Sequence, residues 1–232
     1  MLISGIQKTT LLDYPGKISC IIFTAGCNLR CIYCHNGDFV LPEKIKEIKN
    51  FIPEEIFFNF LKNKIGILDG VVICGGEPTL QKNLVKFCGK IKDLGFLVKL
   101  DTNGQNPRIL KELLEKRLVD YIAMDIKGDY ENLQNLLGIN YLKDDYFESI
   151  KIIKNSQIDY EFRTTLVKNY HNLADFEKVV KQIDGSKKYF LQNYKGGNTL
   201  VPDFDGKSFL NNELIDFKNI ALKYVESCNI RF

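Results

Sequence analysis

The chain has 232 residues, which is enough for one sizeable domain or two small ones. Hydrophobic residues make up 45% of it and charged residues 26%, a composition typical of a folded globular protein and not of a disordered chain. The 32 Lys and Arg residues and the 29 Asp and Glu residues give a formal net charge of +3. So small a charge gives no reason to expect nucleic acid or an anionic membrane as the partner.

The amino-terminal stretch MLISGIQKTTLLDYPGK lacks the basic head and long apolar run of a secretory signal. Apolar runs such as SCIIFTAG and GVVICGG are strand-sized, so no membrane span is predicted. We therefore expect a cytoplasmic protein. There are seven cysteines, an odd number, and three of them lie within residues 26–36. In a reducing compartment this favours metal ligation over disulfide bonds.

Six apolar, β-rich segments alternate along the chain with segments of helical periodicity. The predicted strands cover residues 18–24, 70–75, 96–101, 120–126, 160–166 and 188–192. The predicted helices include those that open at Pro53 and Pro107 and those over 80–94 and 208–228. This alternation favours an α/β fold with a parallel sheet and right-handed crossovers. A partial (βα)6 TIM-like barrel is the first choice and an open doubly wound sheet the second. Both bind ligands at the carboxyl ends of their strands.

Three cysteines, Cys27, Cys31 and Cys34, follow the first predicted strand in the spacing CxxxCxxC. A structural zinc site would need a fourth ligand, and His35 is a poor one because residues adjacent in sequence seldom reach the same tetrahedral ion. An iron–sulfur centre suits a group of thiolates better, although a four-iron cluster ordinarily takes four cysteines. Three cysteines would leave one iron open to a substrate or cofactor. The loop is therefore predicted to hold a chemically active centre.

The other cysteines and one histidine are left out of the predicted site. Cys20 and Cys74 lie in strands, Cys88 lies on an apolar helix face and Cys228 lies near the carboxyl terminus, so each is interpreted as a small buried hydrophobic residue. His171, in the segment KNYHN after the fifth strand, is interpreted as a surface histidine.

Two further motifs follow the second and third strands. In CGGEP, Gly75 and Gly76 lack side chains, which lets the backbone approach a ligand closely, and Glu77 follows them. In LDTNG, Asp101 precedes Thr102 at a strand end, where a carboxylate can accept hydrogen bonds from ribose hydroxyls. The simpler alternatives, a tight corner and an Asn-Gly turn, stay open at this point.

The fourth and fifth strands supply charged side chains. In MDIKGD, the period of two places Asp125 and Lys127 on one face of the strand end. Arg163 on the fifth strand is a candidate for the same site, and its alternative is a pairing with Glu161 or Asp125.

The CxxxCxxC loop, with the aromatic Tyr33 directly before its third cysteine, resembles the signature of the radical S-adenosylmethionine (SAM) superfamily. The GGEP, DTNG and D-x-K segments resemble one branch, the activating enzymes of glycyl-radical enzymes. The DYPGK and CHN segments look most like the activating proteins of anaerobic (class III) ribonucleoside-triphosphate reductase. The resemblance covers nearly the whole chain. It implies one radical SAM domain over residues 1–232, with a core at about 16–195 and a carboxyl-terminal helix at about 208–228.

This resemblance also implies the ligands of the site. Cys27, Cys31 and Cys34 would bind one four-iron, four-sulfur cluster, and SAM would chelate its fourth iron. The residues implied to contact SAM are Tyr33, Gly75, Gly76, Glu77, Asp101, Thr102, Asp125, Lys127 and Arg163. In some relatives the positions of Asp101, Thr102 and Asp125 hold a monovalent cation.

By the same resemblance, the reaction is reductive cleavage of SAM to methionine and a 5′-deoxyadenosyl radical, which takes a hydrogen atom from a glycine of a partner enzyme. A flavodoxin or ferredoxin is implied as the electron donor. No cysteine lies between Asn36 and Pro53, where some activators insert a ferredoxin-like domain, so one cluster is predicted. Three alternatives stay open: an activator of pyruvate formate-lyase type, a radical SAM enzyme for a small molecule, and a non-catalytic zinc- or cluster-binding module.

Overall fold

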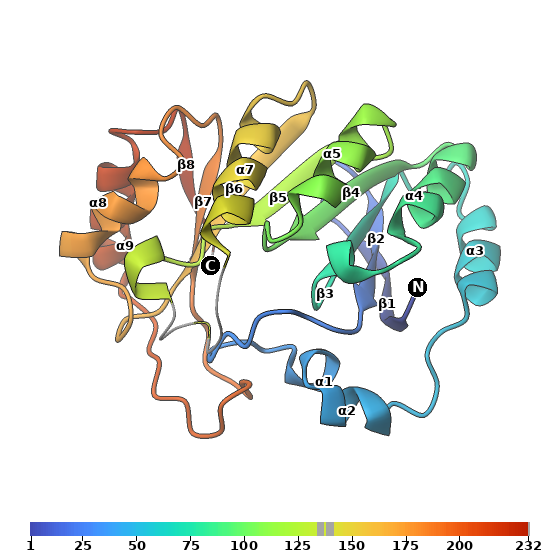
Figure 1. Cartoon of the computed structure of the whole chain (residues 1–232), viewed down its shortest axis with the longest axis horizontal. Helices are drawn as coiled ribbons and strands as arrows, with labels where there is room; N and C mark the ends of the chain where they lie inside the picture. Colours follow the sequence, from blue (N-terminus) through green and yellow to red (C-terminus); the bar gives the residue numbers. More distant parts are fainter. Residues whose placement is uncertain (134–136, 138–141, 232) are drawn as a thin grey trace.

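A computed structural model describes residues 1–133, 137 and 142–231. Its centre is one eight-stranded sheet whose strands are adjacent in chain order (Figure 1). The strands are β1 (Ile3–Thr10), β2 (Ser19–Thr24), β3 (Gly70–Gly75), β4 (Leu97–Thr102), β5 (Tyr121–Asp125), β6 (Asp159–Leu166), β7 (Tyr189–Asn193) and β8 (Cys228–Arg231). β1 is antiparallel to β2, and every later pair is parallel.

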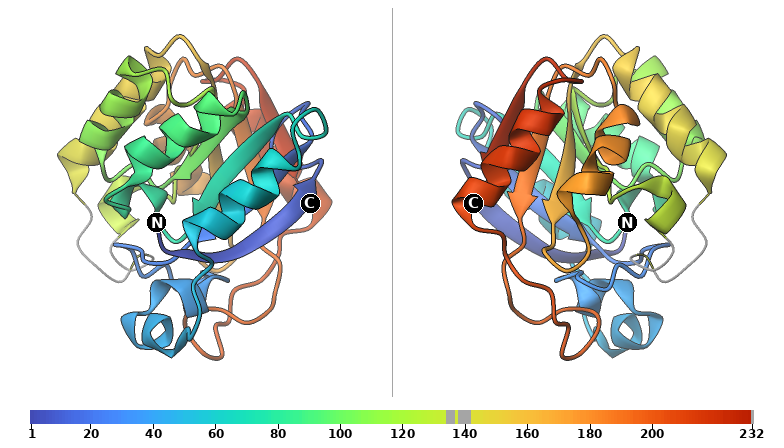
Figure 2. Two further views of the ribbon diagram at one scale, coloured as in Figure 1. Left: turned by 90° about the vertical axis from the view of Figure 1, so that its right-hand side faces the viewer. Right: turned by 90° about the vertical axis from the view of Figure 1, so that its left-hand side faces the viewer.

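Helices connect the parallel strands and lie along one outer face of the curved sheet (Figure 2). The α-helices are α1 (Gly37–Val40), α2 (Pro42–Glu47), α3 (Glu54–Lys62), α4 (Leu84–Asp93), α5 (Pro107–Glu115), α7 (Lys143–Lys154), α8 (Leu173–Lys181) and α9 (Asn211–Ala221). Two short 3-10 helices, η1 (Pro78–Leu80) and η2 (Tyr130–Asn132), follow β3 and β5. α1 and α2 stand apart from this layer, beside the long loop after β7 (Figures 1 and 2). None of the described helices is long and apolar enough to cross a bilayer.

The strand order decides between the two predicted architectures. A doubly wound sheet reverses its strand order at a switch point, whereas here the order runs from β1 to β8 without reversal. The partial barrel is therefore confirmed and the doubly wound alternative is wrong. The predicted six strands correspond to β2 through β7, with ends that shift by at most one residue.

Three features of the fold differ from the sequence-based expectation. β1 and β8 were not predicted: β1 has only its first and last residues buried, and β8 has four residues, so neither shows an apolar strand pattern. The predicted helix over 80–94 begins only at Leu84, because η1 occupies its first residue and Gln81 is extended. The predicted helix over 208–228 is Asn211–Ala221, and the chain after it turns back to add β8 beside β7.

The barrel core explains why the parallel strands read as nearly continuous apolar runs. Strands such as β3 and β5 are buried on both faces, since helices cover one side and the barrel interior the other. Pro107 opens α5 at its first position, and the Asn106 side chain accepts a hydrogen bond from the amide of Ile109. Because β2 to β7 run parallel, each of them ends at the same rim of the barrel, where the next loop begins.

Candidate active site

The cysteine loop and the motifs after the strands meet in one cavity of about 140 Å³ at this rim. Eleven of the twelve predicted site residues line it: Cys27, Cys31, Cys34, Gly75, Gly76, Glu77, Asp101, Thr102, Asp125, Lys127 and Arg163. They come from the ends of five consecutive parallel strands, β2 to β6, and the loops after them. Parallel α/β barrels bind their ligands at this end of the strands.

Backbone hydrogen bonds to other segments hold the loop that carries the three cysteines. The amide of Gly26 donates to the carbonyl of Phe39 at 2.7 Å, and the carbonyl of Cys34 accepts from the amide of Leu200 at 2.8 Å. Burial raises the pKa of Cys27 to about 12 and that of Cys31 to about 11. These thiols are neutral in the metal-free protein at ordinary pH, so metal binding must release their protons.

The arrangement of these thiols bears on the kind of metal centre. Among the described residues, no three His, Cys, Asp or Glu side chains converge on a point where one metal ion could bind. His35 stacks on Tyr194, and its Nδ1 lies 3.1 Å from the carbonyl oxygen of Asn198, so it is engaged outside the cavity. This geometry does not support the Cys3His zinc alternative. Three thiolates that each bind a different iron need not converge on one point, so the donor set fits an iron–sulfur cluster.

The glycine pair after β3 permits close packing against the loop that carries the first cysteine. A Cβ on Gly76 would lie 2.1 Å from the carbonyl oxygen of Gly26. Gly75 has φ +116°, and a Cβ there would lie 2.5 Å from the carbonyl oxygen of Thr24. The Asn36 side chain donates a hydrogen bond from Nδ2 to the carbonyl of Gly75 at 3.2 Å. The two glycines therefore bring the CGGEP segment against the chain's own backbone as well as to the edge of the cavity.

Glu77 links two of the motifs. Its side chain is buried, and Oε1 accepts hydrogen bonds from the amide and hydroxyl of Thr79 at 3.1 and 2.6 Å and from the Thr102 hydroxyl at 2.8 Å. Its Oε2 accepts from the amide of Asn103 at 2.7 Å. Burial raises the pKa of Glu77, although these four donors oppose that shift. The carboxylate thereby fastens the GGEP segment to the DTNG segment.

The charged residues of β4, β5 and β6 form a chain of ion pairs. Arg163 donates to Asp101 Oδ2 and to Asp125 Oδ1, each at 3.0 Å, and Lys127 donates to Asp125 Oδ2 at 2.8 Å. Burial alone would raise the pKa of Asp125, but Arg163 and then Lys127 outweigh it and lower the pKa to about 2. In Asp101 likewise, Arg163 and then Lys99 outweigh burial and lower the pKa.

The predicted alternative for Arg163 is partly realised. It pairs with Asp125, while Glu161 pairs instead with Arg231 at 2.7 and 2.9 Å. Arg163 nonetheless lines the cavity, so the pairing and a place in the site are compatible.

Two residues lie differently from their predicted positions. His171 is 7% exposed, so its interpretation as a surface histidine is wrong. Its Nδ1 accepts from the amide of Val167 at 3.1 Å, which leaves Nε2 to donate to the carbonyl of Lys127 at 3.1 Å. Tyr33 does not line the cavity: it is 5% exposed, and its hydroxyl has no hydrogen-bond partner among the described residues.

Five residues of the cavity wall were missed by sequence reasoning: Leu29, Asn36, Val40, Cys74 and Asn103. Cys74 lines the cavity and is only partly buried, whereas Cys20, Cys88 and Cys228 are buried as predicted. Asn36 and Asn103 also line it, and the Asn103 side chain donates to Asn28 Oδ1 at 2.9 Å. Both asparagines stand inside motifs already recognised, CHN and DTNG, and that adjacency was the available signal.

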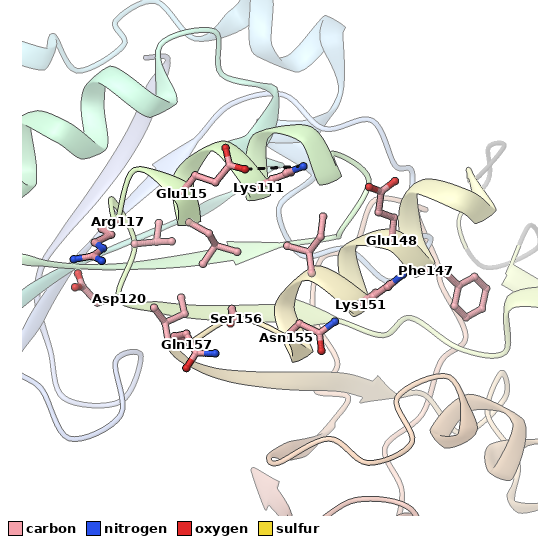
Figure 3. Close-up of a pocket in the computed structure, with 14 residues that line it drawn as sticks. Lys111, Glu115, Arg117, Asp120, Phe147, Glu148, Lys151, Asn155, Ser156 and Gln157 are labelled. Atoms are coloured by element: carbon pink, nitrogen blue, oxygen red, sulfur yellow. Dashed lines mark ion pairs between the residues drawn. The ribbon is translucent and has the colours of Figure 1, made fainter.

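A larger cavity of about 1070 Å³ lies on the outside of the barrel between α5 and α7 (Figure 3). Its rim carries exposed charged side chains, among them the Lys111–Glu115 ion pair (Figure 3). Neither a cysteine nor any of the predicted site residues lines it. Size alone would select this groove, but the chemistry is concentrated in the smaller cavity at the strand ends.

Comparison with known proteins agrees with this geometry. The Radical SAM superfamily profile matches residues 21–183. A Methanocaldococcus jannaschii protein with the provisional description glycyl-radical enzyme activating enzyme is 34% identical over 99% of this chain and 95% of its own length. The pyruvate formate-lyase 1-activating enzyme of Escherichia coli K12 is 29% identical over 78% of this chain and 77% of its own length.

Solved structures support the fold. Streptococcus suis SuiB bound to its precursor peptide SuiA superposes with a TM-score of 0.66 at 18% identity, over 91% of this chain and 48% of SuiB. TYW1 with a lysine-pyruvate adduct gives a TM-score of 0.57 at 16% identity, over 89% of this chain and 72% of that chain. A partial barrel with a three-cysteine loop after its first parallel strand defines the radical SAM class of enzymes. The chain belongs to this superfamily, and within it to the glycyl-radical enzyme activating family.

Proposed function

We propose that this chain cleaves SAM reductively at a single four-iron cluster held by Cys27, Cys31 and Cys34, and that it thereby generates a glycyl radical on a partner enzyme. The observation that carries the proposal is the meeting of three thiols, a glycine pair and an ion-pair chain in one cavity at the strand ends. Bound and reduced beside SAM, such a cluster supplies the electron that breaks the sulfonium S–C5′ bond. The protein's part is to hold that bond in place and to exclude water.

The chain's own residues divide this work. The backbone around Gly75 and Gly76 lies at the cavity edge with no side chain in the way, which suits it to the amino group of SAM. Lys127 and Arg163 line the same cavity as cations, which suits them to the SAM carboxylate. Asp101 and Thr102 are proposed to face the ribose. Tyr33 is proposed to support the adenine side of the site through packing, since burial leaves little of its ring accessible.

The proposed partner is an anaerobic ribonucleoside-triphosphate reductase, on the basis of the DYPGK and CHN segments. A partner of pyruvate formate-lyase type is the second candidate, favoured by the similarity to the pyruvate formate-lyase activating enzymes of Escherichia coli and Clostridium pasteurianum. A flavodoxin or ferredoxin is proposed as the electron donor. A cytoplasmic location is proposed in keeping with seven free thiols in the described chain.

Anaerobic cluster reconstitution, followed by reduction in the presence of SAM, tests the chemistry. We expect 5′-deoxyadenosine from the wild-type protein, none from Cys31→Ala, and wild-type yield from the control Cys88→Ala, whose thiol is buried on α4 away from the cavity. Zinc in place of iron, or an intact cluster that never cleaves SAM, would support the non-catalytic binding module instead.

The partner is tested separately by incubating the active enzyme with a class III reductase or with pyruvate formate-lyase. A glycyl radical signal in electron paramagnetic resonance on the reductase alone supports the first candidate. A signal on the lyase alone supports the second, and 5′-deoxyadenosine without a signal on either protein points to a different substrate.

A further inference from the structure

Lys99 is a buried lysine that the SAM site, as described so far, does not use. It lies on β4 two residues before Asp101, on the same face of the strand and therefore deeper in the barrel. Lys99 is 1% exposed, and its Nζ donates a hydrogen bond to Asp101 Oδ1. A lysine is almost never so fully buried unless its charge is paired. The ammonium of Lys99 is therefore held in the core by a specific ion pair with Asp101.

Among the described residues, Asp101 is the anionic partner of the Lys99 ammonium. The neighbours of Lys99 across the sheet are Val72 on β3 and Tyr121 on β5. The Tyr121 ring centre lies 5.9 Å from Nζ, and among the described residues Asp101 supplies the one hydrogen-bond acceptor of this ammonium. The ammonium thus lies between an aromatic wall and the carboxylate, on the side away from the cavity opening.

The charges of the cluster can be counted oxygen by oxygen. Asp101 accepts from Lys99 and Arg163, and Asp125 accepts from Arg163 and Lys127, so each of the four carboxylate oxygens contacts a cationic donor. Three cations and two anions give this cluster a charge of +1. Glu77 lines the same cavity and offsets this charge when it is ionised, so the attraction for a ligand that presents a carboxylate comes from Lys127 and Arg163, the two cations in the cavity wall.

A monovalent metal ion at this point would need several of the same oxygens. Hard cations are held by carboxylate, carbonyl and hydroxyl oxygens, yet here the Asp101 and Asp125 oxygens already have N–H donors. The Thr102 hydroxyl is also engaged, since it donates to Glu77 and accepts from the amide of Gly104 at 3.1 Å. A metal ion here would have to share these oxygens with two ammonium groups and a guanidinium, and the repulsion between it and these three cations would oppose its binding.

We propose that Lys99 is a positioning residue that serves as the permanent internal cation of this site, so that SAM binding requires no monovalent metal ion. Through Asp101 it fixes the place of Arg163, one of the two cations in the cavity wall that are proposed to meet the SAM carboxylate. The inference rests on the proposed function only for the identity of that anionic ligand.

The wild-type protein provides the first test. Thermal unfolding of the metal-free protein is compared in potassium, sodium and tetramethylammonium chloride at equal ionic strength, since the methyl groups of tetramethylammonium prevent close ligation by carboxylate and hydroxyl oxygens. We expect the same melting temperature in all three salts, and the same SAM affinity for the reconstituted protein. A melting temperature or affinity that rises in potassium or sodium overturns the proposal, because an ion that binds the folded state stabilises it.

The second test replaces the ammonium with an apolar side chain. Lys99→Met is expected to bind SAM about 30-fold more weakly in tetramethylammonium, as for truncation of a buried charge pair, and to recover affinity saturably in potassium or sodium. Adding Asp101→Asn should abolish that recovery. The control is Lys92→Met, which breaks a Lys–Asp pair of 2.7 Å on α4 outside the site and should show no salt-specific change.

A folded Lys99→Met protein that binds SAM as the wild type does, or that no small cation rescues, overturns the assignment and leaves Lys99 as a residue of the core alone. If Lys99→Met fails to fold, the wild-type salt comparison decides. If the wild-type protein binds no SAM, the proposed function fails, while the unfolding measurements on metal-free protein still test Lys99.

Discussion

Replacing Glu77 by glutamine tests whether one buried carboxylate holds two motifs of the site together. Glu77 is 1% exposed and accepts four hydrogen bonds, three at Oε1 and one at Oε2. Glutamine has nearly the same shape but offers one acceptor oxygen and one amide nitrogen. Its best orientation keeps the oxygen toward Thr79 and Thr102, which turns the nitrogen toward the amide of Asn103.

The expected cost follows from these contacts. The Asn103 amide loses its acceptor in a buried place, which costs about 1–3 kcal/mol. The other three bonds lose the charge that roughly doubles their strength. Relief of the desolvation that raises the pKa of Glu77 offsets part of this loss. We expect a net destabilisation of about 2–3 kcal/mol, or roughly 5–10 °C in melting temperature for a chain of this size.

Thermal unfolding of the metal-free protein measures this cost, and hydrogen exchange locates it. The Asn103 amide should exchange faster in Glu77→Gln than in the wild type, and SAM affinity should fall because the DTNG segment is no longer fastened to GGEP. Thr102→Val, which removes one donor to Glu77 and the acceptor of the Gly104 amide, should cost about 1–2 kcal/mol and leave Asn103 protected. An unchanged melting temperature with a protected Asn103 amide would refute the linking role of Glu77.

Three further predictions concern stability and its dependence on pH. Gly76→Ala should lower the free energy of unfolding in urea by about 2 kcal/mol or more, because its Cβ would lie 2.1 Å from a carbonyl oxygen. The control Gly196→Ala, whose Cβ would have nothing within 4 Å, should change it by no more than about 0.5 kcal/mol. Equal effects of the two substitutions would contradict the packing account. Burial lowers the pKa of His171 from 6.5, so wild-type stability should fall below about pH 6.5 by at most ~1.4 kcal/mol per pH unit. That His171 contribution should be missing in His171→Asn, and parallel pH profiles would argue against it. The pKa of Asp125 is lowered from 3.8 to about 2. The wild-type protein should therefore be more stable than Asp125→Asn by a constant amount above about pH 5, and this difference should shrink as the pH falls toward 2. A difference that does not depend on pH would show that the ion pairs of Asp125 contribute nothing.

Local sequence patterns were sufficient to predict the parallel strands and the chemical character of the site. Strands β2 to β5 are buried on both faces over most of their length, so each leaves a largely apolar run, and the alternation of strands with helices specifies a parallel sheet. Cys27, Cys31 and Cys34 are close in sequence, so their spacing alone predicts a shared centre. Parallel strands that end at one rim bring their following loops together, which is why eleven of the predicted residues line one cavity.

Features that depend on partners distant in sequence could be recognised only in the folded chain. The strands β1 and β8 carry little apolar pattern, and it is pairing with the sheet edges that makes them strands. His171 reads as a loop residue until its contact with the carbonyl of Lys127, 44 residues away, shows it buried. The same holds for Lys99. The alternation of residues in β4 places it on one face of the strand, but the sequence does not show that this face points into the barrel interior. Local patterns report which side of an element is apolar, whereas the pairing of buried charges is set by long-range packing.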